Sequence, residues 1–248
     1  MASFQIFSPS EQQTLRKAGK ILRGCLQHVA TFVKPGITTQ SLDEVAEAYI
    51  REHGGEPAFK GYNNFPATLC ISVDDECVHG IPGPRVLEDG NIVKLDGGVL
   101  LDGLYTDACI SVPVGTIASD AQHLLRVTSQ ALETAVAMIK PGIRIGDISA
   151  TIQHAVESER CNCIPALTGH GLGKTLHQVP AIPNVGRKGT GATLPVGTLI
   201  AVEPIVALGR GEILQDDDGW TIRTKDGSLS AHFEHTLLIT EGGCEVIA

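Results

Sequence analysis

Two aspartates on one predicted β-hairpin could bind a common metal ion. Apolar strands meet at Asp102-Gly103, a dipeptide typical of a two-residue turn, and such a turn fixes which residues face each other. Asp96 should face Cys109 and Asp107 should face Gly98, so both aspartates lie on one face of the hairpin. Two buried anions this close need a cation or a proton to offset their repulsion. A divalent metal ion would do so, and a solvated pair of aspartates is the alternative.

Two glutamates and one histidine extend this set. The apolar run 199–202 ends at Glu203, and Glu234 stands just before the apolar run 237–239, so both carboxylates should be poorly hydrated. His170 lies among glycines, where the backbone can approach a ligand closely. Taken alone, Glu203 could form a salt bridge and His170 could be an ordinary core or surface residue. Together, four carboxylates and one imidazole predict two divalent ions (Co, Mn, Fe or Zn) that activate water and polarise a carbonyl.

An internal repeat explains how these residues could meet. Lys34-Pro35-Gly36-Ile37 recurs 106 residues later as Lys140-Pro141-Gly142-Ile143, and each copy stands between two predicted amphipathic helices. The pattern that ends at Asp96 recurs with an offset of 107 residues and ends at Glu203. These two carboxylates are therefore predicted to be equivalent positions of two halves.

The repeat predicts one catalytic domain over residues 1–248, built from halves 8–115 and 116–248. In this scheme His79-Gly80-Ile81 and His170-Gly171-Leu172 form a third pair of equivalent segments. The expected fold class is α+β, an antiparallel sheet flanked by helices with pseudo-twofold symmetry. A site on the seam between the halves would collect residues from both.

Capping signals give the helix boundaries. Ser8-Pro9-Ser10-Glu11 is typical of a helix start, and this helix should run to about Val33. The next helix should end at Gly54-Gly55. In the second half, helices are expected over about 119–140 and 146–160.

Composition limits the partners and the compartment. A net charge of -9 and a pI near 5.4 argue against a protein that binds nucleic acid or an anionic membrane mainly through positive charge. The chain has neither a secretory leader pattern nor an apolar window long enough to span a membrane, so a soluble protein is expected. Seven scattered cysteines predict a reducing, cytoplasmic location.

Two short motifs do not predict a site of their own. Cys161-x-Cys163 lacks a second pair at zinc-site spacing and is interpreted as structural. Gly173-Lys174-Thr175 lacks the leading glycine of a phosphate loop.

Several motifs, in their order along the chain, resemble those of the type I methionine aminopeptidases, which have a duplicated pita-bread fold. The resemblance spans essentially the whole chain, and the last motif is especially specific. The motifs are Cys70-Ile71-Ser72, His79-Gly80-Ile81-Pro82, the Asp96 and Asp107 hairpin, Gly169-His170-Gly171-Leu172-Gly173, Glu203-Pro204 and Ser230-Ala231-x-Phe233-Glu234-His235-Thr236.

The resemblance implies a role for each ligand. Asp96 would chelate one metal ion, Asp107 and Glu234 would bridge two ions, and His170 and Glu203 would complete the second ion's ligands. Glu203 would also shuttle a proton from the attacking water to the leaving amine.

The resemblance also implies how substrate is held. His79 and His177 would contact the peptide and stabilise the tetrahedral intermediate. The methionine pocket would be built from Tyr62, Phe65, Cys70 and Trp220, for which plain core packing is the alternative. The chain departs from the family pattern at Phe59, Leu176 and Gly97-Gly98, which puts the pocket shape in question.

The implied activity is removal of the initiator methionine from nascent polypeptides when the second residue is small. A monomer with a transient ribosome contact is expected. Asp96-x-Gly98 followed by Tyr105-x-Asp107 leaves an Xaa-Pro aminopeptidase of the same fold as an alternative. A catalytically silent binding module is the non-enzymatic alternative, although such proteins usually lose ligands and all five are present here.

Overall fold

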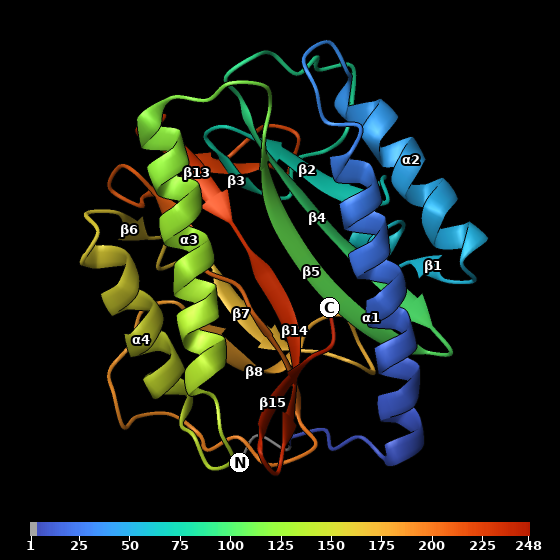
Figure 1. The fold of residues 1–248 in the computed structure, drawn as a ribbon, viewed down its shortest axis with the longest axis vertical. Coiled ribbons are helices and arrows are strands. Elements are labelled where there is room, and N and C mark those ends of the chain that lie inside the picture. Colours follow the sequence, from blue (N-terminus) through green and yellow to red (C-terminus); the bar gives the residue numbers. More distant parts are fainter. Residues whose placement is uncertain (1–3) are drawn as a thin grey trace.

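A large antiparallel sheet forms the centre of the molecule (Figure 1). The computed structural model describes residues 4–248, and within them this sheet has nine strands, seven of which follow the order β1-β4-β5-β14-β9-β7-β8. The other two of the nine lie beside that path, since β2 pairs with β4 and β15 pairs with β14. The strands are β1 (Glu56–Pro57), β2 (Leu69–Val73), β4 (Ile92–Leu101), β5 (Leu104–Pro113), β7 (Thr168–Gly171), β8 (Gln178–Pro183), β9 (Leu199–Val202), β14 (Glu234–Thr240) and β15 (Gly243–Val246).

Two small sheets extend this framework. One has the order β13-β10-β6, formed by β13 (Ser230–His232), β10 (Ile205–Ala207) and β6 (Asn162–Cys163). The other has the order β11-β12-β3, formed by β11 (Ile213–Gln215), β12 (Ile222–Thr224) and β3 (Glu76–Val78). A 3-10 turn, η1 (Tyr62–Asn64), follows β1.

Four long helices in the described residues pack around the strands. They are α1 (Pro9–Ala30), α2 (Thr39–Glu52), α3 (Ser119–Met138) and α4 (Ile145–Glu157). Helix α1 packs on β4 and β5, whereas α3 and α4 pack on each other and on β13 and β8 respectively (Figure 1). The predicted capping box is confirmed, because Ser8 and Glu11 bond each other's backbone N–H groups. All four helices end two or three residues before the predicted boundaries.

The predicted hairpin register is confirmed. Asp96 pairs with Cys109 and Gly98 pairs with Asp107 across β4 and β5. Asp102 and Gly103 both have positive φ, 48° and 75°. A two-residue turn whose twist matches that of the strands requires this conformation.

The strand order is symmetrical about the β5–β14 pair. On one side β4 joins β5 and β2 joins β4, and on the other side β9 joins β14 and β7 joins β9. This symmetry supports the proposed halves 8–115 and 116–248. The third predicted parallel is wrong, since His170 lies in β7, whose counterpart is β2, whereas His79 follows β3 in another sheet. Local similarity of three residues cannot specify strand pairing.

Cys161 and Cys163 are buried in the apolar core between α3, α4 and the strands, which agrees with a structural role. No helix in residues 4–248 has the length and apolar character needed to cross a membrane.

Candidate metal centre and substrate pocket

The acidic residues predicted to bind metal converge at the middle of the sheet. The β4–β5 hairpin presents Asp96 and Asp107, and Glu234 begins β14, where it pairs with Cys109 beside them. Glu203 follows the last residue of β9. Both faces of these strands are covered, so Asp96, Asp107, Glu203 and Glu234 are each at most 9% exposed.

His170 completes the cluster from β7. Its Nε2 atom lies 3.5 Å from Glu203 Oε1 and 3.8 Å from Asp107 Oδ2. One donor atom from each of Asp107, His170 and Glu234 lies within 4.8 Å of the other two. The His170 Nδ1 atom lies 3.0 Å from the carbonyl oxygen of Gly171, so a proton on Nδ1 leaves Nε2 free to bind a metal.

The electrostatics of the cluster fit a divalent cation. Asp96 Oδ1, Asp107 Oδ1 and Glu234 Oε1 are buried without a hydrogen-bond partner. Burial raises the pKa of Asp96 to about 7, and burial together with the neighbouring carboxylates raises the pKa values of Asp107, Glu203 and Glu234 far above their usual range. Burial also lowers the pKa of His170 to about 4, which favours the neutral imidazole that metals bind. An oxygen-rich set with a neutral imidazole is therefore a suitable divalent-metal site.

Contacts that the sequence did not reveal fix the predicted ligands in place. The Thr236 hydroxyl accepts from Asp107 N at 2.9 Å and donates to Asp107 O at 2.7 Å, which joins β5 to β14. The Asn184 amide donates to Glu203 O at 2.9 Å. Gly169 lets β7 approach β9, because a Cβ there would lie 2.4 Å from Ala201 O. No local pattern signals these contacts, since each joins residues distant in sequence.

A cavity of about 390 Å³ opens onto the cluster. All eleven residues predicted for the site line it, so the structure brings together residues from both proposed halves. They are Tyr62, Phe65, Cys70, His79, Asp96, Asp107, His170, His177, Glu203, Trp220 and Glu234.

The apolar wall of this cavity is aromatic. Phe65 and Trp220 pack edge to face with ring centroids 5.1 Å apart. Tyr62 is tied to His177, whose Nδ1 atom lies 3.1 Å from the tyrosine hydroxyl. Cys70 is 5% exposed in the same apolar cluster, where burial and nearby carboxylates raise the pKa of its thiol well above the usual range.

The departures from the family pattern belong to this wall. Phe59 and Leu176 are buried in the apolar cluster and line the cavity. Phe59 packs over Gly98, where an added Cβ would lie 3.0 Å from Phe59 Cε1 and 2.8 Å from Ala58 Cβ. The absence of a side chain at Gly98 therefore makes room for the Phe59 ring.

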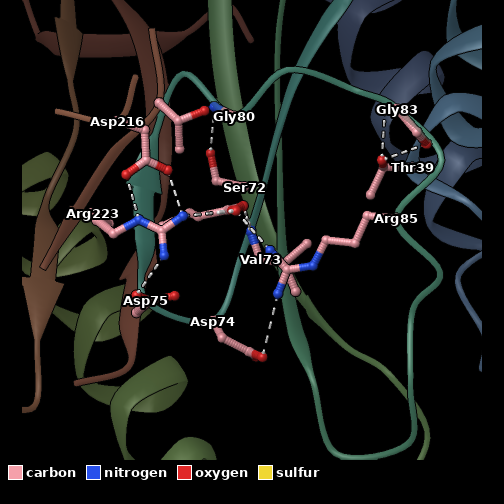
Figure 2. Close-up of polar contacts among 12 residues, drawn as sticks. Thr39, Ser72, Val73, Asp74, Asp75, Gly80, Gly83, Arg85, Asp216 and Arg223 are labelled. Carbon is pink, nitrogen blue, oxygen red and sulfur yellow. Dashed lines mark hydrogen bonds and ion pairs between the residues drawn. The ribbon is translucent and has the colours of Figure 1, made fainter. Parts of the chain in front are cut away.

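His79 reaches the cavity through an unusual backbone conformation. Its φ is 60°, a left-handed value that costs a non-glycine residue on the order of 1–3 kcal/mol. Gly80 follows, and its N–H donates to Ser72 Oγ at 3.0 Å (Figure 2). A Cβ at Gly80 would lie 2.4 Å from Ile71 O, so only glycine permits this close approach to β2.

Trp220 is held through the hairpin that carries it. It stands in the turn between β11 and β12, and β12 carries Arg223. Arg223 bonds Asp216 at the start of that turn and Asp75 in the β2–β3 turn (Figure 2). The Trp220 side of the cavity is thereby linked to the segment that precedes His79.

Sequence reasoning missed His232 and Lys94. His232 is 2% exposed and lines the cavity, and its only signal was the unassigned position within the Ser230–Thr236 motif. Lys94 is 1% exposed two residues before Asp96, and its ammonium donates to Asp74 O at 2.8 Å and Ser230 O at 3.1 Å. Its place in an apolar strand gave no sign that carbonyl oxygens would surround it.

Comparison with known proteins settles the family. Residues 13–241 match the model of metallopeptidase family M24. The chain belongs to this family. It is 42% identical over 240 residues to methionine aminopeptidase 1 of Bacillus subtilis, covering 97% of both chains. It is 36% identical to the methionine aminopeptidase of Escherichia coli, covering 99% of this chain and 94% of that protein.

Solved structures of similar proteins confirm the fold. The methionine aminopeptidase of Thermotoga maritima superposes with a TM-score of 0.98, at 43% identity and with 99% of both chains covered. The prolidase of Pyrococcus furiosus superposes with a TM-score of 0.78 at 20% identity, over 98% of this chain but 64% of the prolidase. The predicted α+β pita-bread fold is therefore correct. Membership of this metallopeptidase family also implies a divalent-metal cofactor.

Proposed function

We propose that this M24 metallopeptidase removes the N-terminal methionine from polypeptides whose second residue is small. The observation that carries the proposal is the cavity in which an apolar aromatic wall meets the carboxylate and histidine cluster. Such a cavity suits an unbranched apolar side chain placed beside a hydrolytic centre. Full-length similarity to methionine aminopeptidases supports the same activity.

Two divalent ions, of Co, Mn, Fe or Zn, would be held by Asp96, Asp107, His170, Glu203 and Glu234. When bound, such ions supply a hydroxide at neutral pH and polarise the scissile carbonyl. The five side chains hold this centre rigidly because their strands pair with one another. Among the proposed ligands, Asp107 and Glu234 lie at the centre of the sheet and would be shared between the ions.

The remaining chemistry belongs to side chains of this chain. Glu203 takes up the proton of the attacking water at its carboxylate and delivers it to the leaving amine. His79 and His177 hydrogen-bond the substrate peptide, and the Tyr62 hydroxyl orients the His177 ring. Burial lowers the pKa of His79 to about 4 and also lowers that of His177, so both act as neutral imidazoles.

The wall of Tyr62, Phe65, Cys70 and Trp220 receives the methionine side chain. Phe59 and Leu176 narrow the cavity further, which excludes branched side chains. We place the enzyme in the cytoplasm as a monomer that acts on nascent polypeptide N-termini, with a transient contact to the ribosome.

Peptide cleavage tests this proposal. The purified protein, assayed in turn with Co, Mn, Fe and Zn, should with at least one of them release methionine from Met-Ala-Ser and leave Met-Leu-Ser and Xaa-Pro peptides intact. Cleavage confined to the bond before proline would instead identify an Xaa-Pro aminopeptidase. Absence of cleavage with every one of the four metals, in a protein that binds them, would indicate a binding module.

A further inference from the structure

A second buried histidine faces the proposed metal centre. His232 is the last residue of β13 and lies two residues before Glu234 in the chain. It pairs with Ile205 of β10, which lies two residues after Glu203. Its backbone is fixed by Ser111, whose hydroxyl accepts from His232 N at 3.0 Å and donates to His232 O at 2.7 Å. The position of the ring between the two glutamates is thus set by strand pairing.

The His232 ring has no hydrogen-bond partner. Both ring nitrogens are buried and unpartnered within the described residues. Leaving a buried polar group unpaired costs on the order of 1–3 kcal/mol, so such a group calls for a ligand in the assembled protein. The ring lines the cavity, which gives a ligand access to it.

The distances identify the kind of ligand. His232 Nε2 lies 3.8 Å from Glu203 Oε2 and 3.8 Å from Glu234 Oε2, too far for a hydrogen bond to either. Two donor atoms bound to one ion at about 2.1 Å each are separated by up to about 4.2 Å, so 3.8 Å suits a shared ion. His170 has a similar relation to the other oxygen of the same carboxylate, with Nε2 3.5 Å from Glu203 Oε1.

We propose that His232 is a further nitrogen ligand of the metal centre, on the Glu203 Oε2 side, across that carboxylate from His170. This inference rests on the metal centre assigned under the proposed function. A second imidazole makes the ligand set richer in nitrogen, which favours Zn, Fe or Co over Mn.

Metal binding by protein from which all metal has been removed tests whether His232 is a ligand. Wild type, His232→Gln, His232→Ala and the exposed His154→Gln as a control are titrated with Co(II), followed by calorimetry and visible absorption. The affinity for at least one ion should fall about tenfold or more in both His232 variants, and the His154 control should bind like wild type. Equal Co(II) affinity in wild type and His232→Gln would overturn the proposal.

A measurement on unaltered protein covers the case in which the variants fail to fold. X-ray absorption of the Co-loaded wild type should count two imidazole ligands per pair of ions, and a count of one would refute the role of His232. A raised KM with unchanged Co(II) affinity in His232→Gln would mean a substrate contact and would equally overturn it. If wild type binds no divalent ion, the proposed metal centre itself fails, which is a distinct result.

Discussion

Phe59→Ala should lower both the free energy of unfolding and the catalytic efficiency toward methionine peptides. Phe59 is 8% exposed and packs with Ala58, Phe65 and Leu176. Truncating a fully buried phenylalanine costs about 3–5 kcal/mol of unfolding free energy. Because this ring borders an open cavity that water can enter, we expect the lower end, about 3 kcal/mol. Urea unfolding, with the 39% exposed Phe32→Ala as the matched control, measures the difference.

The same variant should lose activity through a wider pocket. Lost contacts with a hydrophobic substrate side chain are worth about 1–3 kcal/mol, or about 10–200-fold in kcat/KM. The loss should be greater for Met-Ala-Ser than for Leu-Ala-Ser, because the wider pocket accepts a branched side chain better. Both peptides are assayed at one metal concentration.

Gly98→Ala tests the packing argument itself. The added Cβ would lie 2.8 Å from Ala58 Cβ, and 3.0 Å from both Phe59 Cε1 and Thr106 O. Overpacking of this kind costs about 1–3 kcal/mol. Phe59→Ala removes only one of these three contacts. The double variant Phe59→Ala/Gly98→Ala should therefore recover only part of the stability lost through overpacking, with a coupling free energy of about 0.5–1 kcal/mol between the two substitutions. Strict additivity, or a Phe59→Ala enzyme with unchanged kcat/KM, would refute the view that Phe59 replaces bulk missing at Gly98.

Four further changes have distinct expected results. Glu203→Gln should retain its circular dichroism spectrum and lose at least about a hundredfold in kcat, and unchanged turnover would exclude Glu203 as the proton carrier. Thr236→Val removes the hydroxyl that serves Asp107 N and O, so it should lower the unfolding free energy by about 2–4 kcal/mol, and a loss under 0.5 kcal/mol in urea would contradict this. Arg223→Ala breaks partly exposed ion pairs, so it should change stability by under about 1 kcal/mol but raise KM by loosening the Trp220 hairpin, and an unchanged KM would speak against that linkage. Chelation should abolish activity and lower Tm, since an ion present at a hundred times its Kd stabilises the fold by about 2.7 kcal/mol, and a Tm independent of added metal would contradict a bound cation.

The hairpin and its aspartates were predictable because they depend on local rules. A two-residue turn sets the pairing of every later residue, so the face shared by Asp96 and Asp107 follows from counting. The capped start of α1 is local in the same sense, since Ser8 and Glu11 lie within one helical turn.

Residues that carried no motif or repeat signal, and whose position depends on distant pairing, were not predictable. Thr236 contacts Asp107 across 129 residues, and His232 reaches the cavity only because β13 pairs with β10. The wrong equivalence of His79 and His170 has the same origin, because their similar neighbours say nothing about which strand each accompanies. Phe59 stood out as a departure from the family pattern, but its relation to Gly98 required the packing of two segments 39 residues apart.

The buried charge of the centre ties metal binding to folding. Asp96, Asp107, Glu203 and Glu234 come from three strands and one strand end, and none has a lysine or arginine within ion-pairing distance in the described residues. In the folded chain, burial and mutual repulsion raise the pKa values of these carboxyls, so ionising them without a cation costs free energy that the unfolded chain, where they lie apart in water, does not require. A bound divalent cation would stabilise the ionised carboxylates and so favour folding, because the same convergence that costs free energy without the ion would provide the ion's ligands. Since the four residues are drawn from both proposed halves, an ion bound by them would join those halves across the β5–β14 pair, and its binding should stabilise the contact between the halves more than either half alone.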